Sequence, residues 1–233
     1  MSIKAILFDL DGTLLPMDQD EFVRAYVGGL VKTSAALGYD GQKMADAIMR
    51  GTAAMVKNTG EKTNEEAFWQ IIYDTFGEKI DKGMYDDFYK TDFQRVSEVC
   101  GKEALSKEII ECVREKGLRC ILATNPLFPS VATESRIRWA GLSPEDFEYF
   151  TTYESSRFCK PNLDYYKEIL EKLALSPSEC LMVGNDVGED MITRELGMQT
   201  FLLTPCLINR KGEDISVFKH GDARELLEFI KAI

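Results

Sequence analysis

The sequence lacks the features of a secreted or membrane protein. Its six cysteines include no Cys-x-x-Cys pair, and at this chain length their spacing predicts reduced side chains, not a disulfide framework or a zinc site. The apolar run near the N-terminus stops at Asp9, so it is too short for the core of a signal peptide and far too short for a membrane span. These absences predict a cytoplasmic protein with no membrane partner.

Positive charge is also scarce. The 28 lysine and arginine residues stand against 39 aspartate and glutamate residues, which gives a formal net charge of −11. A surface of that sign repels phosphate backbones, so we expect no nucleic-acid partner. A small anionic substrate remains compatible with the composition, because a binding pocket can reverse the local sign.

The chain of 233 residues is long enough for one large domain or two unequal ones, and its content of 45% apolar and 29% charged residues is that of a globular protein. Residues 3–9 form a short apolar run that ends in a carboxylate, as a buried parallel strand does. Residues 19–99 instead show helical periodicity, and Thr63 opens a capping box before one of the apolar faces. This stretch predicts an all-α unit of four helices.

After Gly101 the pattern alternates between helices and strands. We expect helices at 106–116, 130–140, after Pro161, at 189–196 and at 223–233, and strands at 118–124, weakly at 149–153, at 180–184 and at 200–203. Such alternation predicts an α/β fold whose parallel sheet is covered by helices on both faces. The first strand would join this sheet, which makes the helical stretch an insertion.

Polar residues follow several of these predicted strands, at the edge of the sheet where such folds bind ligands. In chain order they are Asp9 and Asp11, Thr124 and Asn125, Lys160 in a loop, and Asn185, Asp186 and Asp190. Two acidic clusters that converge repel each other unless a cation lies between them. Oxygen ligands in small number favour Mg²⁺. Taken singly, each segment also fits an ordinary turn, so the prediction depends on their joint order.

In that order and spacing the residues resemble the four motifs of the haloacid dehalogenase superfamily, and most closely its phosphatases with a helical cap after the first strand. The run at residues 9–14, Asp-Leu-Asp-Gly-Thr-Leu, is the most specific part of the resemblance. It implies a Rossmann-like parallel sheet formed by residues 1–16 and 100–233. It also implies that residues 17–99 are an inserted all-α cap that selects the substrate.

The resemblance implies a role for each residue. Asp9 would be the nucleophile that becomes an aspartyl phosphate, and Asp11 the general acid and base. Thr124 and Lys160 would bind phosphoryl oxygens, with help from Asn125.

The same resemblance implies that Mg²⁺ is held by the Asp9 carboxylate, the Asp11 backbone carbonyl and an acid of the last motif. Many members of the superfamily have Asp directly after the glycine of that motif, whereas this chain has Asn185 there. We therefore assign the metal site to Asp186 with Asp190 behind it as an orienting group. A ligand role for Asn185 stays open.

Four functions remain in competition, and a phosphatase acting on a small phosphorylated metabolite is favoured. A phosphomutase would share the core motifs, but its sugar-phosphate members carry a histidine where the chain enters the cap, and residues 16–26 contain none. The dehalogenase branch lacks the acid at Asp11. A non-enzymatic phospho-acceptor has no acidic cluster after the lysine. We expect a monomer or a weak dimer.

The predicted cap gives one weak indication of specificity. Lys43, Arg50 and Lys57 recur every seven residues along one side of a helix, which is usually a solvated face. In the alternative, Arg50 faces the site and binds an anionic group of the substrate. The aromatic residues of this region are expected to form its core, with one of them lining the substrate pocket. His220 is expected at the surface.

Overall fold

The computed structural model describes residues 2–77 and 80–233 and contains the predicted parallel sheet. Its strand order is β3-β2-β1-β4-β5-β6, and every neighbouring pair is parallel. The strands are β1 (Ala5–Phe8), β2 (Arg119–Leu122), β3 (Tyr149–Phe150), β4 (Cys180–Gly184), β5 (Gln199–Leu203) and β6 (Lys219–Gly221). The sequence analysis missed β6, which is three residues long and contains the exposed His220.

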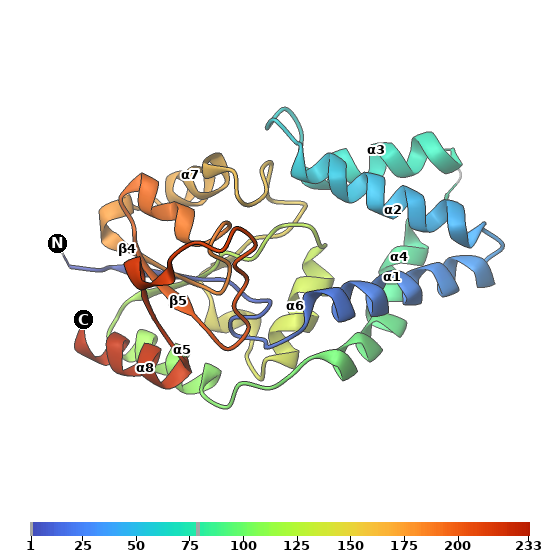
Figure 1. Ribbon diagram of the computed structural model, residues 1–233. Helices are drawn as coiled ribbons and strands as arrows, with labels where there is room; N and C mark the ends of the chain where they lie inside the picture. Colours follow the sequence, from blue (N-terminus) through green and yellow to red (C-terminus); the bar gives the residue numbers. More distant parts are fainter. Residues whose placement is uncertain (1, 78–79) are drawn as a thin grey trace.

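Helices cover both faces of this sheet, as Figure 1 shows. The helices α5 (Ser106–Glu115) and α8 (Ala223–Ala232) lie on one face, and α7 (Leu163–Lys172) lies on the other. Alternate residues of β1 explain the arrangement, because Ile6 and Phe8 join the cluster with α5 and α8, while Leu7 joins the cluster with α7. A strand that is buried on both faces is apolar throughout, which is why the apolar run at residues 3–9 predicted this strand.

One predicted helix is wrong in type and start. The segment expected to be helical at 189–196 forms a 3-10 helix, η4 (Met191–Leu196). The Asp186 carboxylate accepts the backbone N–H groups of Gly188 at 2.7 Å and Glu189 at 2.9 Å. This local turn competes with helix formation, so the helix begins only after it.

The segment between β1 and α5 is helical, as predicted. It contains α1 (Gln19–Ala36), α2 (Gly41–Val56), α3 (Asn64–Phe76), α4 (Gly83–Lys90) and a 3-10 helix, η1 (Asp92–Val99), which was not distinguished in the sequence. Figure 1 shows these helices as a layer to one side of the sheet. The predicted capping box at Thr63 is present.

The two connections to this helical layer run side by side. Met17 and Cys100 form an antiparallel bridge, and the Gly101 N–H donates to the Pro16 carbonyl at 2.7 Å. A second contact comes from α3, where the fully buried Asn64 side chain donates to the carbonyls of Pro126 (3.3 Å) and Phe158 (3.2 Å). The helical layer is therefore fixed to the core at its two connections and again at the start of α3.

Aromatic side chains fill the junction between the layer and the core. Phe93 of η1 is fully buried, with its ring centre 4.9 Å from that of Trp139 on α6 (Ser130–Trp139). Tyr26 of α1 packs edge-on against Phe128 at 5.0 Å. Among the described residues, no helix combines the length and the apolar composition that crossing a bilayer requires.

The junction gives a first prediction about stability. Replacing Phe93 by Ala removes a buried ring that contacts aromatic side chains of both the helical layer and the core. We therefore expect the free energy of unfolding to fall by about 3–5 kcal/mol. Denaturant titration measures the loss. Val217→Ala is the control, because Val217 is 59% exposed and its replacement should change stability by less than about 0.5 kcal/mol. Equal effects of the two substitutions would contradict the packing described here.

Candidate active site

The polar residues singled out in the sequence meet in one cleft of about 240 Å³ at the carboxyl ends of β1, β2 and β4. The residues of the predicted site that line it are Asp9, Asp11, Thr124, Asn125, Asn185, Asp186 and Asp190. β1 lies between β2 and β4 in the sheet, so the three strand ends adjoin each other. Parallel sheets bind ligands where the strand order changes direction, and β1 is that place here.

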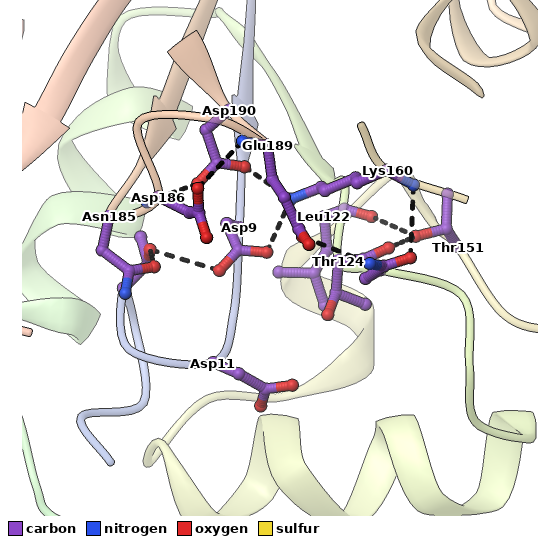
Figure 2. A network of polar contacts seen from close by, with 12 residues as sticks. Asp9, Asp11, Leu122, Thr124, Thr151, Lys160, Asn185, Asp186, Glu189 and Asp190 are labelled. Atoms are coloured by element: carbon purple, nitrogen blue, oxygen red, sulfur yellow. Dashed lines mark hydrogen bonds and ion pairs between the residues drawn. The ribbon is translucent and has the colours of Figure 1, made fainter. Parts of the chain in front are cut away.

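Lys160 lies at the centre of the charged groups, as Figure 2 shows. Its ammonium nitrogen is 2.7 Å from Asp9 Oδ1 and 2.7 Å from Asp190 Oδ1, and its side chain is 1% exposed. Burial alone would lower the pKa of Lys160, but the attraction of Asp190 and Asp9 outweighs it and raises that pKa well above its usual value. The lysine therefore keeps its positive charge.

Asp190 uses both carboxylate oxygens within the chain. Oδ1 accepts from Lys160, and Oδ2 accepts the backbone N–H of Asp186 at 3.0 Å. A Cβ on Gly184 would lie 2.1 Å from Oδ2, so only glycine permits this close approach. Asp190 thus matches the orienting role, and its inclusion among the direct metal ligands does not fit its contacts.

Asn185 is also occupied. Its Oδ1 accepts from the Thr13 hydroxyl at 3.0 Å, and its Nδ2 donates to the Cys206 carbonyl at 2.7 Å. Gly12 has φ +85°, and a Cβ there would lie 2.3 Å from Asn185 Nδ2. The amide therefore ties the turn after β1 to the loop after β5, and the option of Asn185 as a metal ligand loses support.

Asp11 has a partner that sequence reasoning missed. Arg136 of α6 is fully buried, forms an ion pair with Asp11 Oδ2, and lies over the Phe128 ring at 4.4 Å. The other oxygen, Oδ1, is buried without a hydrogen-bond partner. Burial raises the pKa of Asp11, and Arg136 opposes the rise. A carboxyl with a raised pKa keeps its proton to a higher pH than an exposed aspartic acid does.

The sequence did contain a signal for Arg136. Ala132, Arg136 and Ala140 are spaced four residues apart and are all buried, so they share one face of α6. A single charged residue on an apolar helical face requires a buried partner of opposite charge. The partner itself, 125 residues away in the chain, could not be deduced from that pattern.

Thr124 presents a free hydroxyl to the cleft. Its Oγ1 is buried and has no hydrogen-bond partner, while its backbone carbonyl accepts from Thr151 Oγ1 at 2.6 Å and Tyr165 OH at 2.8 Å. These two bonds fix the residue in place. A buried hydroxyl without a partner is costly, which indicates that a ligand supplies the missing contact.

Asn125 lines the cleft beside Thr124, whereas Arg50 lies outside it. Asn125 Oδ1 accepts the Lys160 backbone N–H at 3.3 Å and Nδ2 donates to Glu189 at 3.2 Å, so the side chain supports the lysine loop. Arg50 is exposed, donates to Thr75 of α3 at 2.8 Å, and does not line the cleft. The favoured interpretation of a solvated face is therefore confirmed, since Lys43, Arg50 and Lys57 are all exposed. The alternative, in which Arg50 faces the site, is wrong, because the Arg50 side chain lies along α3.

Two further charged residues line the cleft without having been identified in the sequence. Glu189 is half-buried, and burial raises its pKa. Arg210 is exposed at the edge of the cleft and lies 3.5 Å from Gln19. Both residues are in loops, where neither periodicity nor a strand end marks a functional position.

The donor groups fit Mg²⁺. In residues 2–77 and 80–233 no three His, Cys, Asp or Glu side chains come close enough to hold a metal alone. Mg²⁺ requires fewer, since it binds one or two carboxylates and keeps waters or phosphate oxygens. Asp9 and Asp186 supply two carboxylates in the cleft, and Figure 2 shows them facing one another. One buried lysine does not balance these acids and Asp190, so a divalent cation suits the site.

Comparison with known proteins agrees with this geometry. Residues 3–193 match the family model described as haloacid dehalogenase-like hydrolase. The chain belongs to the haloacid dehalogenase-like hydrolase family. It is therefore an enzyme of the hydrolase class, and the resemblance noted in the sequence is confirmed.

Relatives of this hydrolase cover nearly its whole length. A phosphoglycolate phosphatase from Vibrio parahaemolyticus is 28% identical and covers 98% of this chain and 96% of its own. A phosphoglycolate phosphatase from Vibrio vulnificus is 25% identical over 87% of this chain and 84% of its own. The crystal structure of a HAD phosphatase from Thermococcus onnurineus superposes with a TM-score of 0.60 at 19% identity and covers 99% and 97% of the two chains, which supports the fold.

The Arg136–Asp11 pair gives the second prediction. Arg136→Met leaves the Asp11 carboxyl, which is 19% exposed, without its cation, so we expect a loss of about 1–3 kcal/mol in the free energy of unfolding. Thermal and denaturant unfolding measure it. Arg138→Met on the same helix is the matched control, because the exposed Arg138 pairs only with Glu134 and its loss should cost less than about 1 kcal/mol. If both variants are equally stable, the ion pair does not hold Asp11.

Proposed function

We propose that this hydrolase is a phosphatase that cleaves the monoester of a small phosphorylated metabolite through an aspartyl phosphate on Asp9. The observation that supports it most is the pair of buried, unpartnered oxygens, Thr124 Oγ1 and Asp11 Oδ1, in the same cleft as Asp9. One is suited to donate a hydrogen bond to a phosphoryl oxygen and the other to exchange a proton. The relatives named as phosphatases support the same reaction class.

In the first step, an Asp9 oxygen attacks phosphorus and the bond to the alcohol oxygen breaks. Asp11 gives its proton to the departing alkoxide, so the alcohol leaves neutral. Burial, which raises the pKa of Asp11, keeps that proton available at higher pH than for an exposed aspartic acid. Lys160 and Thr124 bind the phosphoryl oxygens and stabilise the charge that develops on them.

In the second step, Asp11 is a carboxylate and accepts a proton from water. The resulting hydroxide oxygen bonds to phosphorus, the acyl phosphate bond breaks, and Asp9 is restored together with free phosphate. Arg136 binds Asp11 through Oδ2 alone, which leaves Oδ1 for both proton transfers. We assign Arg136 a positioning role, since it touches neither the nucleophile nor the phosphoryl group.

The groups suited to hold Mg²⁺ are the carboxylates of Asp9 and Asp186 and the backbone carbonyl of Asp11. When bound, the ion neutralises phosphoryl oxygens and aligns them for in-line attack. Asp190 and the turn at Gly188 hold Asp186 in place for this purpose. We further propose that residues 1–16 and 100–233 perform the chemistry and that residues 17–99 select the substrate.

The function predicts a specific pattern of activity. The protein should release phosphate from p-nitrophenyl phosphate with Mg²⁺, and EDTA should stop the reaction. Asp9→Asn should abolish turnover because the amide is not a nucleophile. Asp11→Asn should lower kcat by about 10²–10⁴ and leave a phosphoenzyme that acid quench and mass spectrometry detect.

Wild-type turnover in Asp9→Asn would rule out the aspartyl phosphate. Asp146→Asn is the control, since this aspartate pairs with Arg114 outside the cleft and should retain full activity. Incubation with a hexose 1-phosphate tests the phosphomutase alternative, which requires a hexose 6-phosphate to form faster than free phosphate.

The free hydroxyl of Thr124 gives the fourth prediction. Thr124→Val keeps the shape and removes one donor to the phosphoryl group, so kcat should fall by about 10²–10³. Stability should not fall, because the hydroxyl that is removed has no hydrogen-bond partner in the protein. Thr151→Val is its counterpart, because that hydroxyl is already bonded inside the protein and its loss should lower the melting temperature. Steady-state kinetics and thermal unfolding of both variants separate the two roles. A fully active Thr124→Val would contradict phosphoryl binding at this position.

A further inference from the structure

A second cavity of different character lies beside the cleft. This cavity, here called the apolar chamber, has a volume of about 170 Å³ and lies between the helical layer and the core. Val23, Leu127 and Phe128 line both the cleft and the chamber, so the two spaces adjoin. A group attached to a phosphoryl in the cleft would enter the chamber past these three side chains.

The walls of the chamber are aliphatic and aromatic. Helices α1 and α2 contribute aliphatic side chains such as Val27 and Ile48, and the helical layer adds the rings of Phe68 and Trp69. No charged side chain of the described residues lines it. Arg210, the cation that lines the cleft, is not part of the chamber wall.

The polar groups on these walls already have partners inside the protein. Their contacts are Tyr26 OH with Tyr89 OH at 2.9 Å, Trp69 Nε1 to Tyr153 OH at 3.3 Å, Tyr85 OH to Met44 Sδ at 3.0 Å, and Thr52 Oγ1 to the Ile48 carbonyl at 3.0 Å. Burial raises the pKa of Tyr26 to about 12, so this hydroxyl stays neutral. The chamber therefore offers few free hydrogen-bonding groups to a polar substituent that loses its bonds to water on entering.

This chemistry discriminates between classes of substrate. A sugar or a carboxylate in the chamber would lose its hydration without gaining matching bonds, which is strongly unfavourable. An apolar group gains binding on the order of fourfold for each methylene that it buries. A dry cavity of about 150 Å³ is large enough for one benzene ring, so the chamber accommodates a ring or a short alkyl chain.

We propose that the apolar chamber binds the alkyl or aryl body of a phosphate monoester whose phosphoryl group occupies the cleft. The inference rests on the proposed phosphatase function and narrows its substrate class. It separates this hydrolase from the relatives named for phosphoglycolate, because the organic part of that molecule is a carboxylate.

The test compares primary-alcohol phosphates, which have similar leaving groups. With Mg²⁺ present, kcat/KM for 2-phenylethyl phosphate and hexyl phosphate should exceed that for glycerol 3-phosphate and 2-phosphoglycolate by at least about tenfold. Equal or better turnover of the two polar esters would overturn the proposal while leaving the phosphatase intact. Under that outcome, loss of phosphoglycolate turnover in Arg210→Ala would assign the specificity to Arg210 instead.

A pair of variants on α2 tests the location. Thr52 lines the chamber and bonds only to its own helix, so Thr52→Trp should fill the cavity and lower the preference for 2-phenylethyl over glycerol phosphate at least about tenfold. Val56, one turn further, is 46% exposed and outside the chamber, so Val56→Trp should keep the wild-type preference. An unchanged preference in folded Thr52→Trp overturns the assignment.

A binding measurement keeps the two proposals distinguishable. Isothermal titration calorimetry with 2-phenylethylphosphonate and phosphonoacetate needs no turnover, and it also decides the question if Thr52→Trp fails to fold. We expect the phenylethyl compound to bind at least about tenfold more tightly, with a negative heat-capacity change. Tighter binding without hydrolysis of any ester would refute the phosphatase and support the chamber. Tighter binding of phosphonoacetate would refute the chamber.

Discussion

The site depends on one buried cation between two carboxylates. Lys160 pairs with Asp9 and with Asp190 at the same distance, 2.7 Å, and each of these acids belongs to a different end of the chain. Removing one member of such a group leaves an uncompensated buried charge, so the arrangement constrains the turn after β1, the lysine loop and the segment after β4 together. The close approach at Gly184 and the support of Asn125 follow from the same requirement.

A second buried pair keeps the acid away from this centre. Arg136 binds Asp11 from α6, whereas Lys160 binds Asp9, so the two aspartates of one turn have separate cations. The two environments differ. Asp9 lies 2.7 Å from the Lys160 ammonium, whereas burial raises the pKa of Asp11. Gly12, which follows Asp11 directly, has a φ of +85° that brings the turn against Asn185.

The sequence predicted the parallel sheet and the convergence of the polar strand ends, because both follow from local patterns: apolar runs of strand length, and carboxylates directly after them. It failed where the outcome depends on which element lies opposite. The periodicity of α2 showed that Arg50 lies on one side of a helix, but it did not show that α3 lies next to that side. Likewise, the face of α6 did not reveal Asp11 as the partner of Arg136. The type of the segment after Asp190 was wrong because the Asp186 side chain competes with the helix for its N–H groups.

The same aromatic contacts that join the helical layer to the core also shape the space for the substrate. Phe128 packs against Tyr26, covers the Arg136 guanidinium, and lines both the cleft and the apolar chamber. One ring thus contacts the helical layer, the arginine that pairs with Asp11, and both of the adjoining cavities. Because the Phe128 ring is apolar, it makes all three contacts without leaving a polar group unpaired. A charged specificity residue there would have to be desolvated within the packed junction, which is why the free cation, Arg210, lies at the exposed edge of the cleft.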